Sequence, residues 1–234
     1  EEEKASDLVL FMDTLSNVLS NDILETAENR VATGTQVAMA SLEMLLSVMS
    51  ESLLQLPEVA VKFYRLIMYL TDFCPECLSI MNASLLNSLC ECLSAGLTSK
   101  FGPEITAVCL ESTSEVGAFF TRNPEKCTQA VLDHFHGMLP MVFESCLENS
   151  AEASIFSEAC ASLYSLICMD QAYFNNFVQQ LLQRKNNQAA VNILAEAFGR
   201  LFPDQPTLGR RERIGFRQRM EKFLREIQGL LWIR

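Results

Sequence analysis

The chain has 234 residues, of which 49% are hydrophobic, and a formal net charge of −11. Its longest uninterrupted apolar run, from Leu66 to Leu70, is far shorter than the roughly 20 residues that a membrane-spanning helix requires, so we expect no membrane partner. The acidic balance also disfavours nucleic acid, because protein and polymer would carry charge of the same sign.

Charge is distributed unevenly along the chain. Residues 1–204 carry 26 acidic and 10 basic side chains, whereas residues 205–234 carry 3 and 8. The acidic body favours a basic protein partner. The C-terminal arginines are candidates for phosphate contacts, but they lack the interleaved aromatics of single-strand binders. We therefore interpret this segment as a helix that spreads its arginines over the preceding helices. These arginines are Arg210, Arg211, Arg213, Arg217 and Arg219.

Amphipathic helices are predicted from the N-terminus onwards. A first helix is predicted over residues 5–20, followed by a looser polar stretch over residues 21–34. The next helix is predicted over residues 36–50. Another one begins at Pro57, because proline is favoured in the first helical turn, and ends before Pro75.

The middle of the chain repeats this pattern. Asn82 is predicted to cap a helix that runs to about Ser94, and Gly102-Pro103 opens its partner. The next unit starts at Asn123-Pro124, and its helix contains Pro140, where we expect a bend.

The last units are predicted from the same signals. Asn149, with Glu152 three residues later, predicts a helix start of the capping-box type. Asp170 is predicted to cap the helix after that, and residues 188–202 form its partner. A final amphipathic helix is predicted over residues 210–228.

The first helices of the pairs start near residues 36, 83, 127 and 171, and these steps lie in the range of about 40–47 residues that HEAT-like repeats use. We therefore predict an all-α fold, a right-handed α-solenoid of HEAT-type antiparallel helix pairs. Residues 1–34 would be the end of a preceding repeat and a connecting loop, residues 35–204 about four HEAT-like repeats, and residues 205–234 a C-terminal capping helix. Because the chain begins with Glu1 and not with methionine, we expect it to be part of a longer protein.

Cysteine and histidine patterns are the only candidates for metal or catalytic chemistry that the sequence offers. The nine cysteines are scattered over predicted helices, which is typical of reduced, buried thiols. Cys74-Pro-Glu-Cys77 has the spacing of half a zinc site, but the chain has no second such pair. Asp133-His134 and His136 offer a base and a carboxylate without a nucleophile motif. We predict no metal, no cofactor and no enzymatic activity.

Acidic side chains on the second helices of the pairs are the candidate partner-binding residues. Glu104, Glu111 and Glu115 are 7 and 4 residues apart, so they share one helix face. Glu158 lies on the next second helix, away from its predicted core face. These four carboxylates are either a solvated face or an acidic inner wall for a basic partner.

The stretch from Ala38 to Glu76 resembles the C-terminal repeats of the exportin-4 family, which are karyopherins of the importin-β superfamily. The similarity is carried by scattered segments with similar spacing, namely Leu45–Ser50, Leu53–Pro57, Phe63–Ile67, Gly96–Ser99, Leu194–Phe198, Phe223–Glu226 and Gly229–Leu231.

This resemblance implies a nuclear export receptor that binds protein cargo cooperatively with Ran-GTP, meets nucleoporins and shuttles between nucleus and cytoplasm. Cargoes associated with the family are the hypusine-bearing translation factor 5A, a Smad protein and Sox-type factors. The resemblance implies the role of no individual residue here. The alternative is a generic HEAT or armadillo protein-interaction scaffold without Ran coupling.

Overall fold

The computed structural model describes residues 2–20, 30–73, 75–98, 101–149, 152–202, 207–227 and 230. Within this part of the chain the regular structure is entirely helical, which confirms the all-α prediction. The helices are α1 (Glu2–Ser20), α2 (Arg30–Val48), α3 (Glu51–Leu54), α4 (Pro57–Phe73), α5 (Cys77–Ile80), α6 (Ala83–Leu97), α7 (Pro103–Arg122), η2 (Pro124–Lys126), α8 (Gln129–Glu148), α9 (Ala153–Met169), α10 (Gln171–Gln183), α11 (Gln188–Leu201) and α12 (Arg210–Glu226). None of them is long and apolar enough to cross a bilayer.

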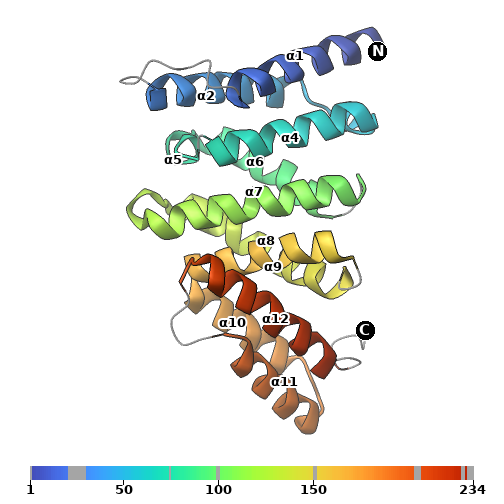
Figure 1. Ribbon diagram of the computed structural model, residues 1–234, viewed down its shortest axis with the longest axis vertical. Helices are drawn as coiled ribbons and strands as arrows, with labels where there is room; N and C mark the ends of the chain where they lie inside the picture. Colours follow the sequence, from blue (N-terminus) through green and yellow to red (C-terminus); the bar gives the residue numbers. More distant parts are fainter. Residues whose placement is uncertain are drawn as a thin grey trace.

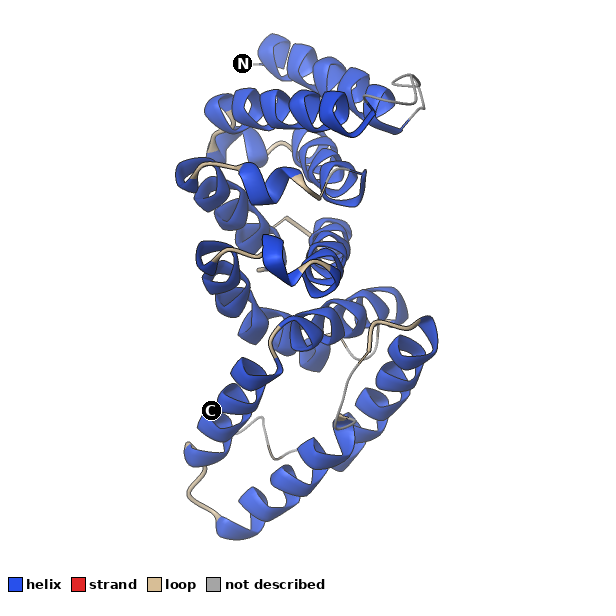
Figure 2. Cartoon of the chain, turned by 90° about the vertical axis from the view of Figure 1, so that its left-hand side faces the viewer, coloured by secondary structure: helices blue, strands red, loops and turns tan. Residues whose placement is uncertain are grey.

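The helices stack in two rows (Figures 1 and 2). In one row α1, α4, α7 and α9 lie side by side, and each contacts the next. Behind them α2, α6, α8 and α10 form the second row, with contacts between consecutive members. At the C-terminal end α12 packs against α9 and therefore extends the first row, while α11 packs against α10 and α12. This arrangement is compatible with an α-solenoid.

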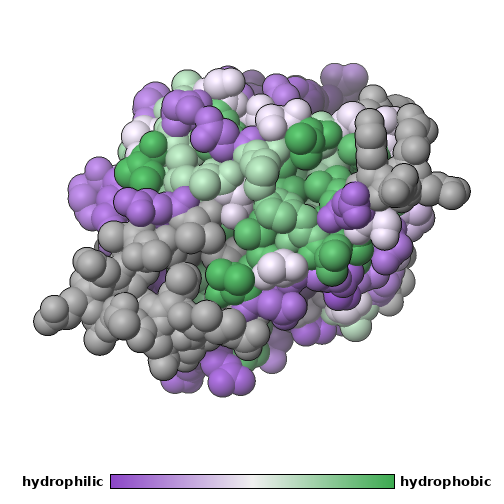
Figure 3. All heavy atoms as spheres, turned by 90° about the horizontal axis from the view of Figure 1, so that it is seen from above, coloured by the Kyte–Doolittle hydropathy of each residue, from purple (hydrophilic) through white to green (hydrophobic). Residues whose placement is uncertain are grey.

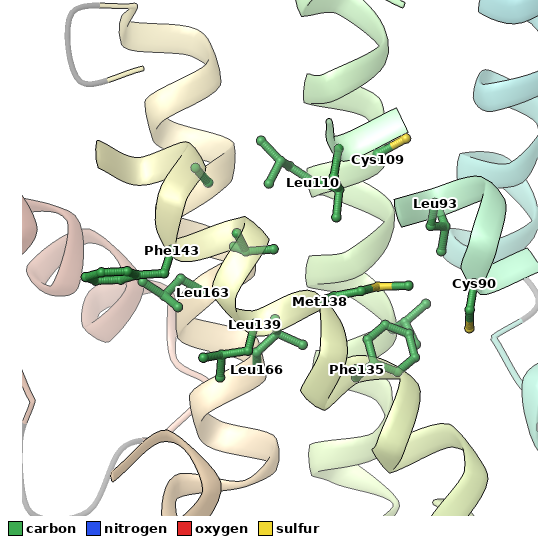
Figure 4. Packing of buried hydrophobic residues seen from close by; sticks show 14 of the residues in the cluster. Cys90, Leu93, Cys109, Leu110, Phe135, Met138, Leu139, Phe143, Leu163 and Leu166 are labelled. Atoms are coloured by element: carbon green, nitrogen blue, oxygen red, sulfur yellow. The ribbon is translucent and has the colours of Figure 1, made fainter. Parts of the chain in front are cut away.

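The core lies between the two rows (Figure 4). Each buried leucine in it contributes about 1.5–3 kcal/mol relative to an exposed one. The labelled side chains come from neighbouring helices of both rows and include Cys90, Leu93, Cys109, Leu110, Phe135, Met138, Leu139, Phe143, Leu163 and Leu166. Consecutive pairs of helices therefore share one continuous apolar layer.

Several helix starts lie where local signals predict them. The side chain of Asn82 accepts a hydrogen bond from the backbone N–H of Leu85, and that of Asp170 accepts one from Tyr173, so both predicted caps are confirmed. α4 begins at Pro57. Gly102 precedes α7 with a φ of 96°, a conformation that favours glycine, and Pro103 follows in the first turn.

Two predicted boundaries were wrong. α9 begins at Ala153, and Asn149 instead closes α8, where its Nδ2 donates to the carbonyl oxygen of Ser145. Asparagine suits either end of a helix, so the residue type alone did not decide between them. The polar stretch predicted over residues 21–34 is also shorter, because α2 already begins at Arg30 and runs through Gly34. A single glycine such as Gly34 destabilises a helix by only about 1 kcal/mol, so it does not have to end one. Residues 21–29 lie outside the described part of the chain.

The N-terminal end of the stack exposes apolar side chains (Figure 3). Leu10 is 68% exposed, and Met44 and Val48 are about half exposed. A groove of about 660 Å³ runs between α1, α2 and α3, and Leu8, Phe11, Met44, Leu45, Val48, Leu53 and Asp7 line it. This end of the stack is apolar. By contrast, the outward face of the first row, meaning the face that points away from the second row, is charged.

Candidate protein-binding surface

Four carboxylates gather on the outward face of the first row. They are Asp72 on α4, Glu111 and Glu115 on α7, and Glu158 on α9, and we call these four residues the acidic wall. Burial raises the pKa of Asp72, Glu111 and Glu158, and neighbouring carboxylates of the wall raise each of these pKa values further. The four groups are thus close enough to repel one another electrostatically.

The close approach of α7 and α9 brings Glu115 and Glu158 onto one surface. A Cβ atom on Gly117 would come within 3.1 Å of the Cβ of Ser165, so the absence of a side chain there lets the helices touch. The hydroxyls of Ser114 and Ser165 lie 3.2 Å apart across the same contact. The small residues between α7 and α9 therefore let these two helices lie close together, which brings Glu115 and Glu158 onto the same surface.

Three of the four carboxylates singled out from the sequence belong to the wall, and one does not. Glu104 instead accepts a hydrogen bond from Arg65 of α4, at 2.6 Å. It precedes Glu111 by two helical turns, or about 10 Å along the axis. The sequence reasoning missed Asp72, although it lies seven residues after Arg65 and hence on the same face of α4.

Two arginines of α12 border the wall at α9. Arg213 Nη1 lies 3.6 Å from a carboxylate oxygen of Glu115, and its Nη2 donates to the hydroxyl of Ser165 at 3.4 Å. Arg217 Nη1 donates to the hydroxyl of Ser157 at 3.3 Å. Both arginines act to lower the pKa of Glu158, but burial and the neighbouring carboxylates outweigh them, so this pKa remains raised. The positive charge supplied by α12 therefore compensates the wall only in part.

The histidines considered as bases have separate partners elsewhere. His134 Nε2 lies 2.6 Å from the amide oxygen of Asn87, and His136 Nε2 lies 3.0 Å from the carboxylate of Asp170. The ring of His136 also stacks on Tyr173, with 3.6 Å between centroids. Asp133 accepts a hydrogen bond from Gln129 on its own helix.

The cysteines that the structure describes are mostly packed in the core. Cys90, Cys109, Cys146 and Cys160 are buried free thiols. Burial raises the pKa of Cys90 to about 12, which disfavours the reactive thiolate at neutral pH. Cys77 is also buried, and Cys74, the other half of the predicted CxxC pair, lies outside the described residues. Within the described ranges, no three histidine, cysteine or acidic side chains are grouped as a metal site.

No protein-family model matches the sequence, and no solved structure matches the fold. The chemistry that the wall supports is electrostatic binding. Its carboxylates are held against mutual repulsion, and a cation bound between them would relieve that repulsion.

Proposed function

We propose that this chain is a right-handed HEAT-type α-solenoid that recognises a protein partner, and that the acidic wall receives a basic segment of that partner. The observation that carries the proposal is the wall itself: carboxylates from three successive helices of one row, only partly compensated by arginine. A surface built across stacked helices fits an extended protein partner better than a small molecule.

We further propose that the chain belongs to a nuclear export receptor that binds protein cargo cooperatively with Ran-GTP. The support for this step is the sequence resemblance to the exportin-4 family, which includes the stretch from Ala38 to Glu76 and covers most of the chain as scattered segments of similar spacing. In such a receptor, small shifts between neighbouring helix pairs add up along the stack, so binding at one place alters the shape of another. Cargo of basic character would suit the wall.

Transport function is tested by incubating the full-length protein with nuclear extract and with purified Ran held in its GTP or its GDP form. Retention of cargo and Ran together in the GTP form alone, followed by mass spectrometry of the cargo, is the expected result. Equal cargo retention in both forms would instead identify a scaffold without Ran coupling. Loss of cargo on adding Ran-GTP would identify an import receptor.

The role of the wall is tested in the same experiment with Glu111→Gln and Glu158→Gln combined. A matched control is Glu43→Gln combined with Glu125→Gln, which removes the same charge from exposed positions on α2 and η2. Cargo retention should fall in the wall variant and stay unchanged in the control. Equal retention by both variants would remove the wall from the proposal.

A further inference from the structure

We propose that Arg213 and Arg217 of α12 act as an internal competitor for the acidic wall and thereby lower its affinity for a basic partner. This inference rests on the proposed binding of a basic segment at the wall. It adds a regulatory contact that is built into the fold, in which one helix of the chain occupies part of its own binding surface.

α12 is held by its apolar face and not by these two arginines. Phe216, Met220 and Phe223 are buried against the neighbouring helices, with exposed fractions of 2% or less. Arg213 and Arg217, four residues apart, lie together on one flank of this apolar stripe. Their side chains can therefore leave the wall while the helix stays in place.

The contacts of the two arginines are of a kind that a partner can replace. The distance of 3.6 Å between Arg213 and Glu115 is longer than the 2.7–2.9 Å typical of a charged hydrogen bond. The side chains of Arg213 and Arg217 are 25% and 39% exposed, so water and incoming cations reach these two guanidinium groups. A partner guanidinium that binds a carboxylate with two parallel hydrogen bonds would displace such a contact.

The arginines also leave one side of the wall open. They lie at its α9 side, where Arg213 contacts Glu115 and Ser165, while Arg217 contacts Ser157 and pairs with Glu221 of its own helix at 3.4 Å. Asp72 on α4 and Glu111 on α7 form the side nearer α4, whereas in the described part of the chain Arg213 and Arg217 form their ion pairs with Glu115 and Glu221. A basic partner would first bind at Asp72 and Glu111 and would then compete with α12 for Glu115 and Glu158.

The competitor is tested by changing Arg213→Gln and Arg217→Gln together in the full chain. The matched control is Arg211→Gln with Arg225→Gln, since both residues lie exposed on the same helix and the change removes the same charge. Binding of a fluorescent octa-arginine peptide is measured by anisotropy at low salt, because salt screens the attraction. Circular dichroism and thermal melting establish that each variant is folded.

The Arg213→Gln, Arg217→Gln variant should bind the peptide about 3–10-fold more tightly than the control, which isolates the local effect from the change in net charge. A third variant, Arg213→Lys with Arg217→Lys, keeps the charge but loses the planar fork, so its affinity should lie between those of wild type and the glutamine variant.

Equal affinities of the glutamine variant and the control would overturn the inference, as would weaker binding by the glutamine variant. A gain in affinity that persists when Glu115→Gln and Glu158→Gln are added would also overturn it, because these are the two carboxylates for which α12 competes. Failure of the proposed function has a different signature, since the wall variant Glu111→Gln, Glu158→Gln would then bind the peptide as tightly as Glu43→Gln, Glu125→Gln, which removes the same charge elsewhere.

Discussion

At the scale of single residues, Glu111 is electrostatically coupled to the other three carboxylates of the acidic wall. Burial raises its pKa first, and Asp72 on α4 and Glu115 on its own helix raise it further. Glu111 in turn raises the pKa of Glu158 on α9. Glu111 therefore interacts with carboxylates on all three helices of the wall.

The raised pKa of Glu111 predicts how stability depends on pH. A carboxyl whose pKa is higher in the folded than in the unfolded state contributes stability at low pH that is lost as pH rises through the folded value. Glu111→Gln should therefore raise the melting temperature by about 1–3 °C at pH 7, and this difference should vanish as the pH falls below the ordinary carboxyl range. Thermal melts of both proteins across that range measure it. A difference that does not change with pH would contradict the electrostatic explanation.

Gly96 illustrates steric constraint at one residue. A Cβ atom there would collide with Cys109 Sγ of α7 and come within 2.9 Å of the ring of Tyr64 on α4. Gly96→Ala should therefore destabilise the protein by about 1–3 kcal/mol, measured by urea unfolding. Gly137→Ala on α8 is the control, since nothing lies within 4 Å of its added methyl group, and it should stabilise the protein by about 0.5–1 kcal/mol. If both substitutions stabilise, the three-helix contact at Gly96 is looser than the structure shows.

At the scale of helices, the sequence predicts an element wherever its signal is local. Pro57, Asn82, Gly102-Pro103 and Asp170 mark their helices correctly because each acts within one turn of its own backbone. The start of α9 was missed because Asn149 serves the end of the preceding helix. Local chemistry therefore predicted most helix starts. It failed at α9, where two helix ends compete for one residue, and at α2, which continues through Gly34.

Asn187 offers a test of how much a capping side chain at a helix start contributes to stability. Its side-chain oxygen accepts hydrogen bonds from the backbone N–H groups of Ala189 and Ala190 and so caps α11. Asn187→Ala should cost about 1 kcal/mol of stability. The adjacent Asn186→Ala is the control, and its effect should stay within about 0.5 kcal/mol, because Asn186 is exposed and lies outside the cap. Equal effects of the two substitutions in urea unfolding would show that the cap contributes nothing measurable.

At the scale of the whole molecule, the full composition of the wall and the placement of α12 could not be predicted from the sequence. Glu111 and Glu115 share a predictable face of α7, and Glu158 lies on α9 away from its predicted core face, but the inclusion of Asp72 and the exclusion of Glu104 depend on how α4 lies along α7. Likewise, no periodicity specifies that α12 packs on α9, which is what brings Arg213 to Glu115. The division into residues 1–34, 35–204 and 205–234, and the HEAT pairing, stay predictions.

The central claim is that the acidic wall binds a basic protein segment. The most direct measurement is a titration of a lysine-rich peptide with wild type, with Asp72→Asn, Glu111→Gln and Glu158→Gln combined, and with Glu43→Gln, Glu125→Gln and Glu152→Gln as an equally charged control. We predict that the wall variant binds at least about tenfold more weakly than the control, and that the difference shrinks as salt is added. Equal weakening of both variants would show that only net charge attracts the peptide, and would contradict the claim.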